Sequence, residues 1–448
     1  MNIIVSADGE LGFYLTKLLS DENHDITVIN DNKDFLDEIN NHYDVLTING
    51  DPALISTLES ARVDRADLFI SVLHQETPNL LTAILAKKMG AKKTIARVSN
   101  TENLKKETRQ FYNDLGINNL VSPENIASKE IVRLLKNSAA EEIFDFSEGK
   151  LSLMLIRLDE KALVINKSLN EIAKENPNLQ FRAVAVHRKG KTIIPNGNNR
   201  FLTGDLAYII TKPEGMDQVL TLGGKGRKEI KNVMIVGGGR IGRLTAKRLQ
   251  DIMNIKLLEI DMNRCDTLCD ELRNTMIIRG DSRDMTLLEE EGISSMDAFI
   301  SLTNDTETNI LTCLLAKQLG VSKTIALVEN IDYINIAQNV NIDTIINKKL
   351  IAASYIDNFT LSPNITSSKV LNGVEAEALE FIVEEDAAVT KRPIKNLSFP
   401  HGAIIGGIVR NNEGFIALGD FQIQANDRVV VFTLPEVIKK VKSLFSKR

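Results

Sequence analysis

The sequence predicts an α/β protein, a tandem duplication in which a doubly wound parallel-sheet domain is each time followed by a small α+β domain. Three observations predict it: the second half of the chain repeats the first, strands and helices alternate at the start of each half, and a glycine-rich loop follows the first strand of each half. Single hydrophobic cores stop growing near roughly 250 to 300 residues. A chain of 448 residues is therefore expected to form several domains.

The duplication is visible when the chain is compared with itself. Gly9, Gly12, Ser71, Asn79 and Gly90 recur at a constant offset of 230 as Gly239, Gly242, Ser301, Asn309 and Gly320. Later in each half the offset falls to 222, where Arg188, Gly197 and Asp205 pair with Arg410, Gly419 and Asp427. Loops of different length explain the change of offset. The duplication thus covers both halves from end to end.

The first domain of each half begins with short apolar strands. In the first half we expect strands at residues 3–5, 26–29, 45–48, 68–72 and 94–98, with a helix at 80–89 between the last two. Strands that alternate with helices are typical of a parallel sheet covered on both faces. Each half should therefore open with a doubly wound sheet.

A different pattern begins near residue 140, where helices become fewer. Short alternating strands are expected around 151–158, 181–187 and 207–211, with turns at residues 195–197 (Pro-Asn-Gly) and 203–205 (Thr-Gly-Asp). Turns of this kind mark the ends of short strands. The small α+β domain that they predict is repeated over residues 375–434.

The domain boundaries follow from these patterns. Residues 222–229 are rich in glycine and basic residues, as flexible connectors are, and we expect them to join the halves. The predicted domains are 1–135 and 140–222 in the first half, a linker at 223–229, and 230–355 and 368–448 in the second half.

Composition argues against several classes of protein. No apolar stretch approaches the roughly 18 to 20 residues that a membrane helix needs, and Met1 leads almost directly into a strand without a signal peptide, so we expect a cytoplasmic protein. A net charge of −6 disfavours nucleic acid as a partner. Three cysteines, with Cys265 and Cys269 on an expected helix, indicate neither a disulfide framework nor a zinc site, and we expect all three to be reduced packing residues.

A glycine motif in the second half points to a ligand. An apolar strand at 233–236 leads into residues 237–242 (Gly-Gly-Gly-Arg-Ile-Gly), which is G-x-G-x-x-G between a strand and a helix. In that context Gly237 permits a tight turn, Gly239 lets a pyrophosphate approach the backbone, and Gly242 allows the helix to pack closely. The phosphates would lie at the positive end of the helix that begins near Arg240. The alternative is a glycine turn that serves packing alone.

Charged residues around this loop fit a nucleotide. Glu259 ends the next apolar strand after Gly239, where it could accept hydrogen bonds from ribose hydroxyls. Arg240 and Arg243 could donate hydrogen bonds to phosphates, or could be solvated surface residues. Asp281 at the end of the third strand, and its counterpart Asp51, could contact the adenine amino group, although Gly-Asp is also an ordinary turn.

The first half departs from this pattern. Ala7 replaces the first glycine, and the loop carries the carboxylates of Asp8 and Glu10, which would repel a phosphate. Asn30 stands where Glu259 stands in the second half. We therefore expect the second pocket to bind nucleotide well and the first to bind weakly or not at all.

The whole chain resembles a known family. Strand, glycine loop, Gly-Asp, residues 301–305 (Ser-Leu-Thr-Asn-Asp) and Asn309 stand in the order found in the TrkA family of peripheral subunits of bacterial potassium transporters, and the small domain follows. That family carries two RCK units, each a Rossmann-like domain and a TrkA-C domain. The resemblance implies that the nucleotide site of the second half consists of Gly237, Gly239, Arg240, Gly242, Glu259, Asp281 and Thr303. In the first half it carries over only to Gly9, Gly12 and Asp51.

The resemblance also implies partners that composition and spacing do not reveal. It implies a homotetrameric ring on the cytoplasmic face of a TrkH-type or TrkG-type potassium-translocating membrane subunit, with NAD(H) or ATP and ADP in the pockets. Such a ligand would shift the open population of the channel by its differential affinity for two states, typically about 1 to 3 kcal/mol.

Other functions use the same fold. An NAD-dependent oxidoreductase shares the fold and the glycine fingerprint. The chain's histidines (His24, His42, His74, His187 and His401) do not recur at the offset of 230 and lie in no recognisable acid–base constellation, so we expect no enzyme. A repressor that senses NADH would need a basic DNA-binding module, which this acidic chain lacks.

Overall fold

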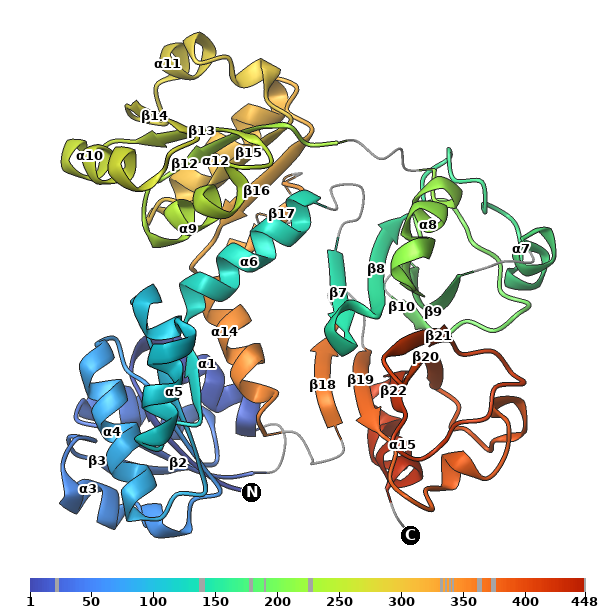
Figure 1. Cartoon of the computed structure of the whole chain (residues 1–448), viewed down its shortest axis with the longest axis horizontal. Helices are drawn as coiled ribbons and strands as arrows, with labels where there is room; N and C mark the ends of the chain where they lie inside the picture. The colour runs from blue at the N-terminus through green and yellow to red at the C-terminus, as the bar shows by residue number, and fades with distance from the viewer. Residues whose placement is uncertain are drawn as a thin grey trace. The chain divides into compact units, whose positions relative to one another are not determined.

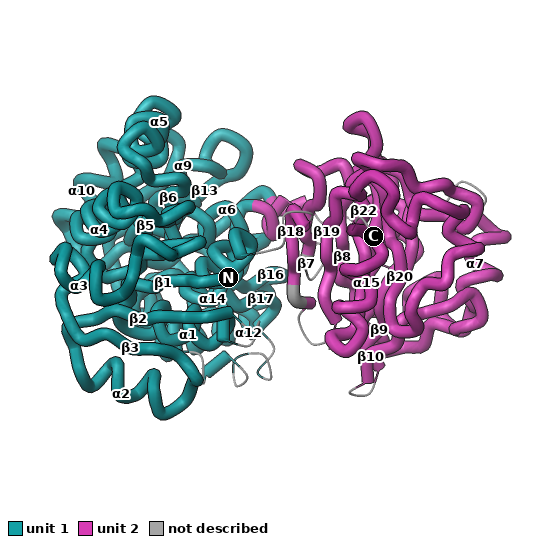
Figure 2. Tube along the Cα trace, turned by 90° about the horizontal axis from the view of Figure 1, so that it is seen from below, with its two compact units in different colours: residues 1–132, 231–360 teal, residues 133–230, 361–448 magenta. Residues whose placement is uncertain are grey.

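The chain forms two compact units, each built from matching parts of both copies (Figure 2). The first unit joins residues 1–132 with 231–360, and the second joins 133–230 with 361–448. The computed structural model describes residues 1–20, 24–136, 142–176, 180–188, 191–224, 229–330, 333–334, 337, 340, 342–360, 365–371 and 376–446. The predicted linker therefore lies partly outside the described residues, as do the expected start of the first small domain at 140 and residue 375, where the repeated strand pattern is expected to begin.

The first unit contains two six-stranded parallel sheets with the same strand order. Figure 1 draws residues 1–132 of this unit in blue to teal and residues 231–360 in green to orange. In sheet order the first consists of β3 (Leu46–Asn49), β2 (Asp25–Asn30), β1 (Asn2–Ala7), β4 (Leu68–Val72), β5 (Lys93–Arg97) and β6 (Asn119–Val121). The second consists of β14 (Thr275–Arg279), β13 (Asn254–Glu259), β12 (Asn232–Val236), β15 (Ala298–Ser301), β16 (Lys323–Leu327) and β17 (Thr344–Ile346). The order in which the first strand lies between the second and the fourth is that of the Rossmann fold, so the predicted fold class is confirmed.

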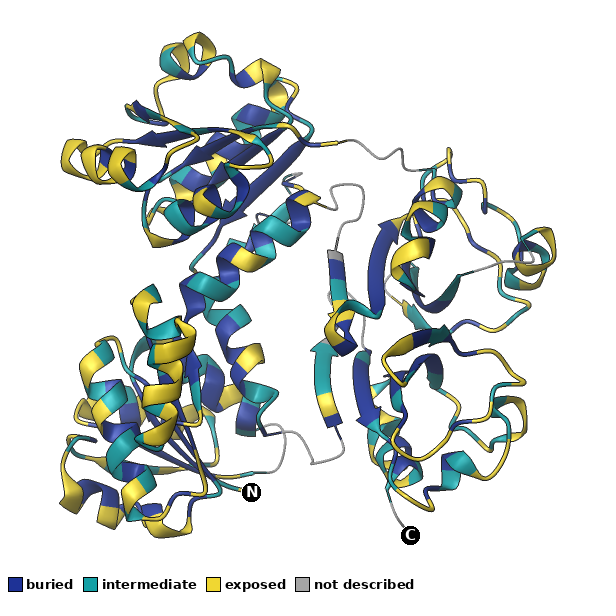
Figure 3. Cartoon of the chain, viewed as in Figure 1, coloured by how far each residue is buried: buried dark blue, intermediate teal, exposed yellow. Residues whose placement is uncertain are grey.

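Helices accompany each parallel sheet. In the first copy they are α1 (Gly9–Ser20), α2 (Lys33–His42), α3 (Ile55–Ser60), α4 (Glu76–Met89), α5 (Lys106–Asp114) and α6 (Pro123–Lys136). In the second they are α9 (Arg240–Leu249), α10 (Met262–Glu271), α11 (Met285–Glu290), α12 (Thr306–Gln318) and α14 (Lys348–Asp357). The central strands are buried along their length, as Figure 3 shows, because helices cover both faces. Each of the five predicted strands is present, and the helix predicted at 80–89 begins earlier, at Glu76.

The second copy sends a helix onto the first. Helix α14 packs against α1, and its residues Ala352, Ala353 and Ile356 are buried in one cluster with Leu11 and Leu15. The buried part of this contact is apolar, and the ion pair between Glu10 of α1 and Lys349 of α14 lies at its edge. It closes the core of the first sheet with a helix that lies far along the chain, in the other copy.

The first copy sends the equivalent helix onto the second. Ser128 of α6 accepts a hydrogen bond from the Thr245 hydroxyl of α9 at 3.1 Å. Arg248 of α9 donates hydrogen bonds to Ser128 and to Asn125 of α6. This second contact is polar, and partial burial lowers the pKa of the Arg248 guanidinium.

The second unit contains two five-stranded antiparallel sheets. In sheet order the first consists of β10 (Lys191–Ile193), β9 (Phe181–Arg188), β11 (Leu206–Thr211), β8 (Leu151–Arg157) and β7 (Glu142–Phe146). The second consists of β18 (Ile365–Val370), β19 (Glu377–Ile382), β22 (Arg428–Thr433), β20 (Ala403–Arg410) and β21 (Glu413–Ile416). The accompanying helices are α7 (Leu169–Glu175), α8 (Met216–Leu222) and α15 (Ile438–Phe445). One apolar cluster spans both sheets, with the Phe146 and Phe432 rings 6.5 Å apart.

The same buried ion pair occurs in both copies of this small domain. Arg188 donates to both carboxylate oxygens of Asp205 at 2.7 Å, and Arg410 donates to those of Asp427 at 2.8 and 2.7 Å. Both aspartates are almost fully buried. The pairing that the offset of 222 suggested is therefore a repeated structural contact.

The cysteine prediction is correct for two residues and wrong for the third. Cys265 and Cys313 are buried, and burial raises the pKa of the Cys313 thiol to about 12. Cys269 is exposed, because α10 buries only Cys265 and Leu268. Among the described helices, none combines the length and the apolar character that crossing a bilayer requires.

Candidate nucleotide-binding site

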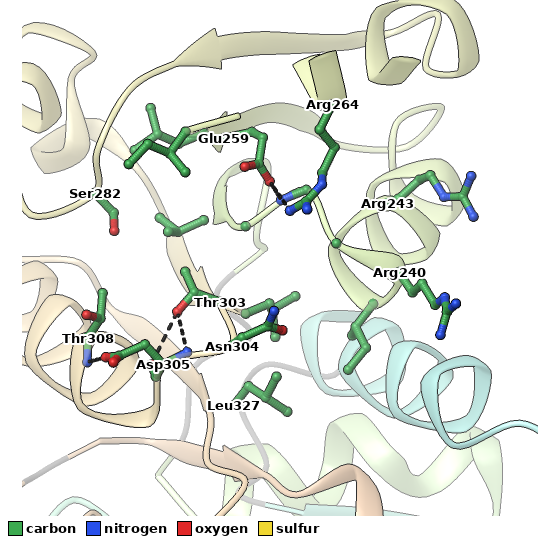
Figure 4. Close-up of a pocket in the computed structure, with 18 of the residues that line it drawn as sticks. Arg240, Arg243, Glu259, Arg264, Ser282, Thr303, Asn304, Asp305, Thr308 and Leu327 are labelled. Atoms are coloured by element: carbon green, nitrogen blue, oxygen red, sulfur yellow. Dashed lines mark hydrogen bonds and ion pairs between the residues drawn. The ribbon is translucent and has the colours of Figure 1, made fainter. Parts of the chain in front are cut away.

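A pocket of about 770 Å³ lies at the carboxyl edge of the second parallel sheet (Figure 4). It is lined by the loop after β12 and by the ends of β13, β14 and β15. Small-molecule sites typically measure about 300 to 1,000 Å³. The structure brings six of the predicted residues to its wall, namely Gly237, Gly239, Arg240, Glu259, Asp281 and Thr303. Gly242, the seventh, is not part of that wall.

The three glycines of the motif meet different steric demands. Gly237 has a φ of +95°, which favours glycine, and its N–H donates to the Leu258 carbonyl at 2.8 Å. A Cβ on Gly242 would lie 1.9 Å from the Gly237 carbonyl oxygen, so only glycine lets α9 approach the loop this closely. A Cβ on Gly239 would meet nothing within 4 Å. The space beside Gly239 is therefore open to a ligand.

The N-terminus of α9 carries unneutralised positive character. Gly239 is its N-cap and provides no side-chain hydrogen bond, and the first turn contains no acidic residue. The first N–H groups of a helix lack intrahelical partners and carry the positive end of the helix dipole. Arg240 is exposed in this turn and has no ion-pair partner among the described residues, whereas Arg243 is bound to Glu271 at 2.7 Å. Both arginines extend from α9 on the same side of the pocket in Figure 4.

Glu259 is buried at the end of β13 and already accepts three hydrogen bonds. They come from the N–H groups of Gly238 at 2.8 Å and Asp261 at 2.9 Å, and from Arg264 at 3.2 Å. An ionised carboxylate offers about four acceptor positions. One position is therefore left for a ribose hydroxyl while Arg264, which Figure 4 shows directed at Glu259, keeps its place.

Asp281 and Asp51 close the turn that follows the third strand of each copy. Asp281 accepts the Arg283 N–H at 2.9 Å, and Asp51 accepts the Ala53 N–H at 2.8 Å. The Arg283 guanidinium also binds Asp281, with its shortest contact at 2.6 Å, and lowers the pKa of that carboxyl. In both copies the aspartate therefore serves an ordinary turn, which was one of the two roles that the sequence left open for it. Contact with adenine stays a prediction.

Thr303 is positioned by a buried asparagine. The Asn309 side-chain oxygen accepts hydrogen bonds from the Thr303 N–H at 2.9 Å, the Thr303 hydroxyl at 2.7 Å and the Ser301 hydroxyl at 2.9 Å. Its amide group donates to the carbonyls of Thr303 and Leu327. The shape of the loop after β15 is therefore fixed without a ligand.

The first copy uses the equivalent edge for internal contacts. Asp8 binds the N–H and the ring of His74 at 2.9 and 2.7 Å, so it bridges the loops after β1 and β4. Glu10 pairs with Lys349 of α14. The Asn30 amide donates to the Ala7 carbonyl within the loop. Gly9 keeps a positive φ of +56°, but a Cβ there would lie 3.0 Å from the His74 ring.

Four charged residues that the sequence analysis did not single out line the pocket of the second copy. Arg264 and Arg283 follow the predicted acids by a few residues, and that spacing could have found them. Glu124 and Lys348 begin the exchanged helices α6 and α14, and no local signal marks them. The pocket of the second copy is therefore completed by a residue of the first, Glu124.

Two domain families match the chain in duplicate. The TrkA-N domain matches residues 3–123 and 233–348, and the TrkA-C domain matches residues 153–222 and 378–446. The matches alternate along the chain in the order that the repeat predicts.

Relatives cover the chain from end to end. It is 30% identical over 451 residues to the Trk system potassium uptake protein TrkA of Vibrio alginolyticus, covering 99% of this chain and 98% of that protein. It is 32% identical over 446 residues to a TrkA homolog of Archaeoglobus fulgidus, covering 99% of this chain and 100% of that protein.

Two solved structures share the fold. The GsuK channel bound to NAD matches with a TM-score of 0.63 and 16% identity, over 99% of this chain and 78% of that chain. GsuK bound to ADP matches with a TM-score of 0.50 and 14% identity, over 80% of this chain and 68% of that chain.

Proposed function

The chain belongs to the TrkA family, and from that premise we propose that it is the nucleotide-sensing regulatory subunit of a Trk-type potassium uptake system. The observation that carries the proposal is the open glycine loop of the second copy. Its helix N-terminus, its exposed Arg240 and its buried Glu259 lie around one pocket, and they are the groups that a phosphorylated nucleoside requires.

The proposed ligand is NAD(H) or ATP and ADP. Phosphates bind the N–H groups beside Gly239 and the Arg240 guanidinium, and ribose hydroxyls bind Glu259. Support comes from the structural neighbours whose names record bound NAD and bound ADP. The remaining predicted residues, Gly237, Gly242, Asp281 and Thr303, shape the glycine turn, the helix approach and the two loops around that ligand.

The first copy is proposed to act as a scaffold rather than as a sensor. Gly9, Gly12 and Asp51 keep the shape of a nucleotide loop, but Asp8 would face a phosphate with a negative charge. The His74 ring contacts Asp8 at hydrogen-bond distance, and Lys349 pairs with Glu10, so both acids already have partners within the protein. Binding there is therefore expected to be weak or absent.

The proposed partner is a TrkH-type or TrkG-type subunit that moves potassium across the membrane. We place a homotetrameric ring of this chain at the cytoplasmic face of that subunit. Nucleotide then acts through its differential affinity for two arrangements of the ring, since a ligand that binds both states equally shifts neither. Coupling of this kind is typically worth about 1 to 3 kcal/mol, so regulation would be graded and would require no chemical turnover.

The test is equilibrium binding of ATP, ADP, NAD and NADH to the purified chain by calorimetry. Glu259→Ala is expected to weaken binding about 10- to 100-fold, because hydrogen bonds to a charged group are worth about 1.5 to 3 kcal/mol. Arg240→Ala should weaken ATP more than NAD, since ATP carries more phosphate charge. Glu10→Gln, in the first copy, is the matched control and should leave the affinity unchanged.

Three outcomes would contradict the proposal. Affinity that survives Glu259→Ala and Arg240→Ala but changes with Glu10→Gln would move the site to the first copy. Absence of binding would contradict the role of nucleotide sensor, and consumption of the nucleotide would indicate an enzyme.

The partner is tested by potassium flux into vesicles that hold the membrane subunit, where the chain should make the flux respond to nucleotide.

A further inference from the structure

The three parts of a nucleotide correspond to three neighbouring strands of the second sheet. The phosphates are expected at the loop after β12 and the ribose at Glu259 after β13, and β14 lies beside β13 on the other side from β12. The base is attached to the ribose away from the phosphate-bearing carbon. It therefore extends toward the end of β14, where residues 280–283 line the pocket. Figure 4 shows Ser282 across the pocket from Arg240.

Arg283 is held at this end by a chelated ion pair. Its Nε lies 3.0 and 3.1 Å from the two oxygens of Asp281, and its Nη2 lies 2.6 Å from one of them. The side chain is nevertheless 69% exposed, because these contacts use the edge of the guanidinium and leave its faces free. A guanidinium face is the surface that stacks on aromatic rings.

The charge of Arg283 also acts on the facing loop. Hydrogen bonds from Thr308 lower the pKa of Asp305, and the Arg283 charge lowers it further. Asp305 lines the same pocket on the loop after β15. Asp281 thus fixes the guanidinium of Arg283 at the end of the pocket where the base is expected.

An exposed apolar side chain lies at the same end. Ile260 directly follows Glu259, lines the pocket and is 60% exposed. The face of a planar cation can stack on a flat aromatic ring, and an apolar side chain can pack against such a ring but has no favourable contact to offer a phosphate.

The first copy shows that the turn itself does not require the arginine. Asp51 accepts the Ala53 N–H at 2.8 Å, as Asp281 accepts the Arg283 N–H, and Ala53 stands at the position of Arg283. The arginine therefore occurs only in the copy with the open pocket, and closing the turn does not account for it.

We propose that Arg283 selects the base of the bound nucleotide by stacking its guanidinium on a purine, while Ile260 covers the other face. This inference rests on the proposed function and names the residue that recognises the base of the proposed ligands. A purine presents a larger stacking face than a pyrimidine, so the site favours ATP over CTP.

The test is calorimetric binding of ATP, AMP, CTP and inorganic tripolyphosphate to the full chain. Arg283→Ala should weaken the binding of ATP and of AMP by the same factor, about 3- to 30-fold for a cation–π contact. It should weaken the binding of CTP less and leave the binding of tripolyphosphate unchanged. Arg283→Lys should restore only part of the loss, because lysine keeps the charge and lacks the plane. Arg65→Ala removes an exposed arginine of the first copy that pairs with Asp64 and should change nothing.

The outcomes separate the inference from the proposed function. Suppose that Arg283→Ala lowers the affinity for ATP more than for AMP, and lowers the affinity for tripolyphosphate as much as that for ATP. That result would make Arg283 a phosphate ligand and overturn the inference. An equal loss for ATP and CTP, or no loss, would overturn it too, with the sensor intact. Failure of the unmodified chain to bind any nucleotide would overturn both.

Discussion

The two parallel-sheet domains share an interior and differ at the edge where a ligand would bind. In each, a buried asparagine organises the loop after the fourth strand. Asn79 accepts from the Ser71 hydroxyl at 2.9 Å and the Leu73 N–H at 2.7 Å. Asn309 accepts from the Ser301 hydroxyl and the Thr303 N–H, both at 2.9 Å. Residues that hold the fold have stayed the same in both copies.

The ligand edge has diverged in charge. Where the second copy has Gly238 and Glu259, the first has Asp8 and Asn30, and each of these first-copy side chains is hydrogen-bonded within the protein. The first edge is closed by the Asp8–His74 contact, while the second is left open around Gly239. The comparison teaches that a repeated motif can keep its backbone while partners within the protein take the place that phosphates are expected to occupy in the other copy.

The largest effect is expected from the ion pairs that the small domains share. Arg188→Ala and Arg410→Ala should each reduce the free energy of unfolding by about 3 kcal/mol or more, because each leaves a buried aspartate without its cation. Differential scanning calorimetry would measure the loss. Lys395→Ala, which removes an exposed pair with Asp420, should cost less than about 1 kcal/mol. If only one of the two variants lost much stability, the ion pair would stabilise one small domain and not the other, and the small domains would lack the shared interior seen in the parallel-sheet domains.

A smaller and equal loss is expected from the asparagines. Asn79→Ala and Asn309→Ala each leave buried backbone groups without partners, at a cost of about 2 kcal/mol. Asn263→Ala, an exposed change on α10, should have almost no effect. Urea unfolding of the three variants would check this. Unequal losses would contradict the shared interior on which the comparison rests.

The smallest effect is expected where the first edge is closed. Lys349→Met removes the pairs with Glu10 and Glu329, and since Glu10 is more than half exposed, the loss should stay below about 1 kcal/mol. It should shrink further at high salt, which screens exposed charges. If the variant instead gained nucleotide binding in the first copy, Lys349 would be a residue that blocks the first site rather than a minor stabilising contact.

The strand periodicity predicted the fold because each strand depends on the residues within it. The repeat then predicted that the same fold occurs twice. The apolar runs of the first copy lie close to the strands that form, and Glu259 ends β13 as expected. Asn30 also occupies the place of Glu259, since both accept from the backbone N–H of the second residue after them. These features depend only on neighbours in the chain.

The completed pocket could not be predicted in the same way. Glu124 reaches it because α6 crosses to the other copy, and a helix that stayed on its own sheet would show the same periodicity. The second role of Asp281, holding Arg283, depends on a side-chain geometry that the Gly-Asp pattern does not specify. Long-range packing and rotamer choice, rather than secondary structure, account for what was missed.

The exchanged helices also explain how the copies could become different. A chain with a single copy would leave the apolar face of its first helix bare, and could cover it only by trading helices with a second identical chain. In such a pair every substitution falls on both sites at once. A polypeptide that carries both partners is free of that constraint, and here Asp8 and His74 close the edge of one copy while the edge of the other is open at Gly239.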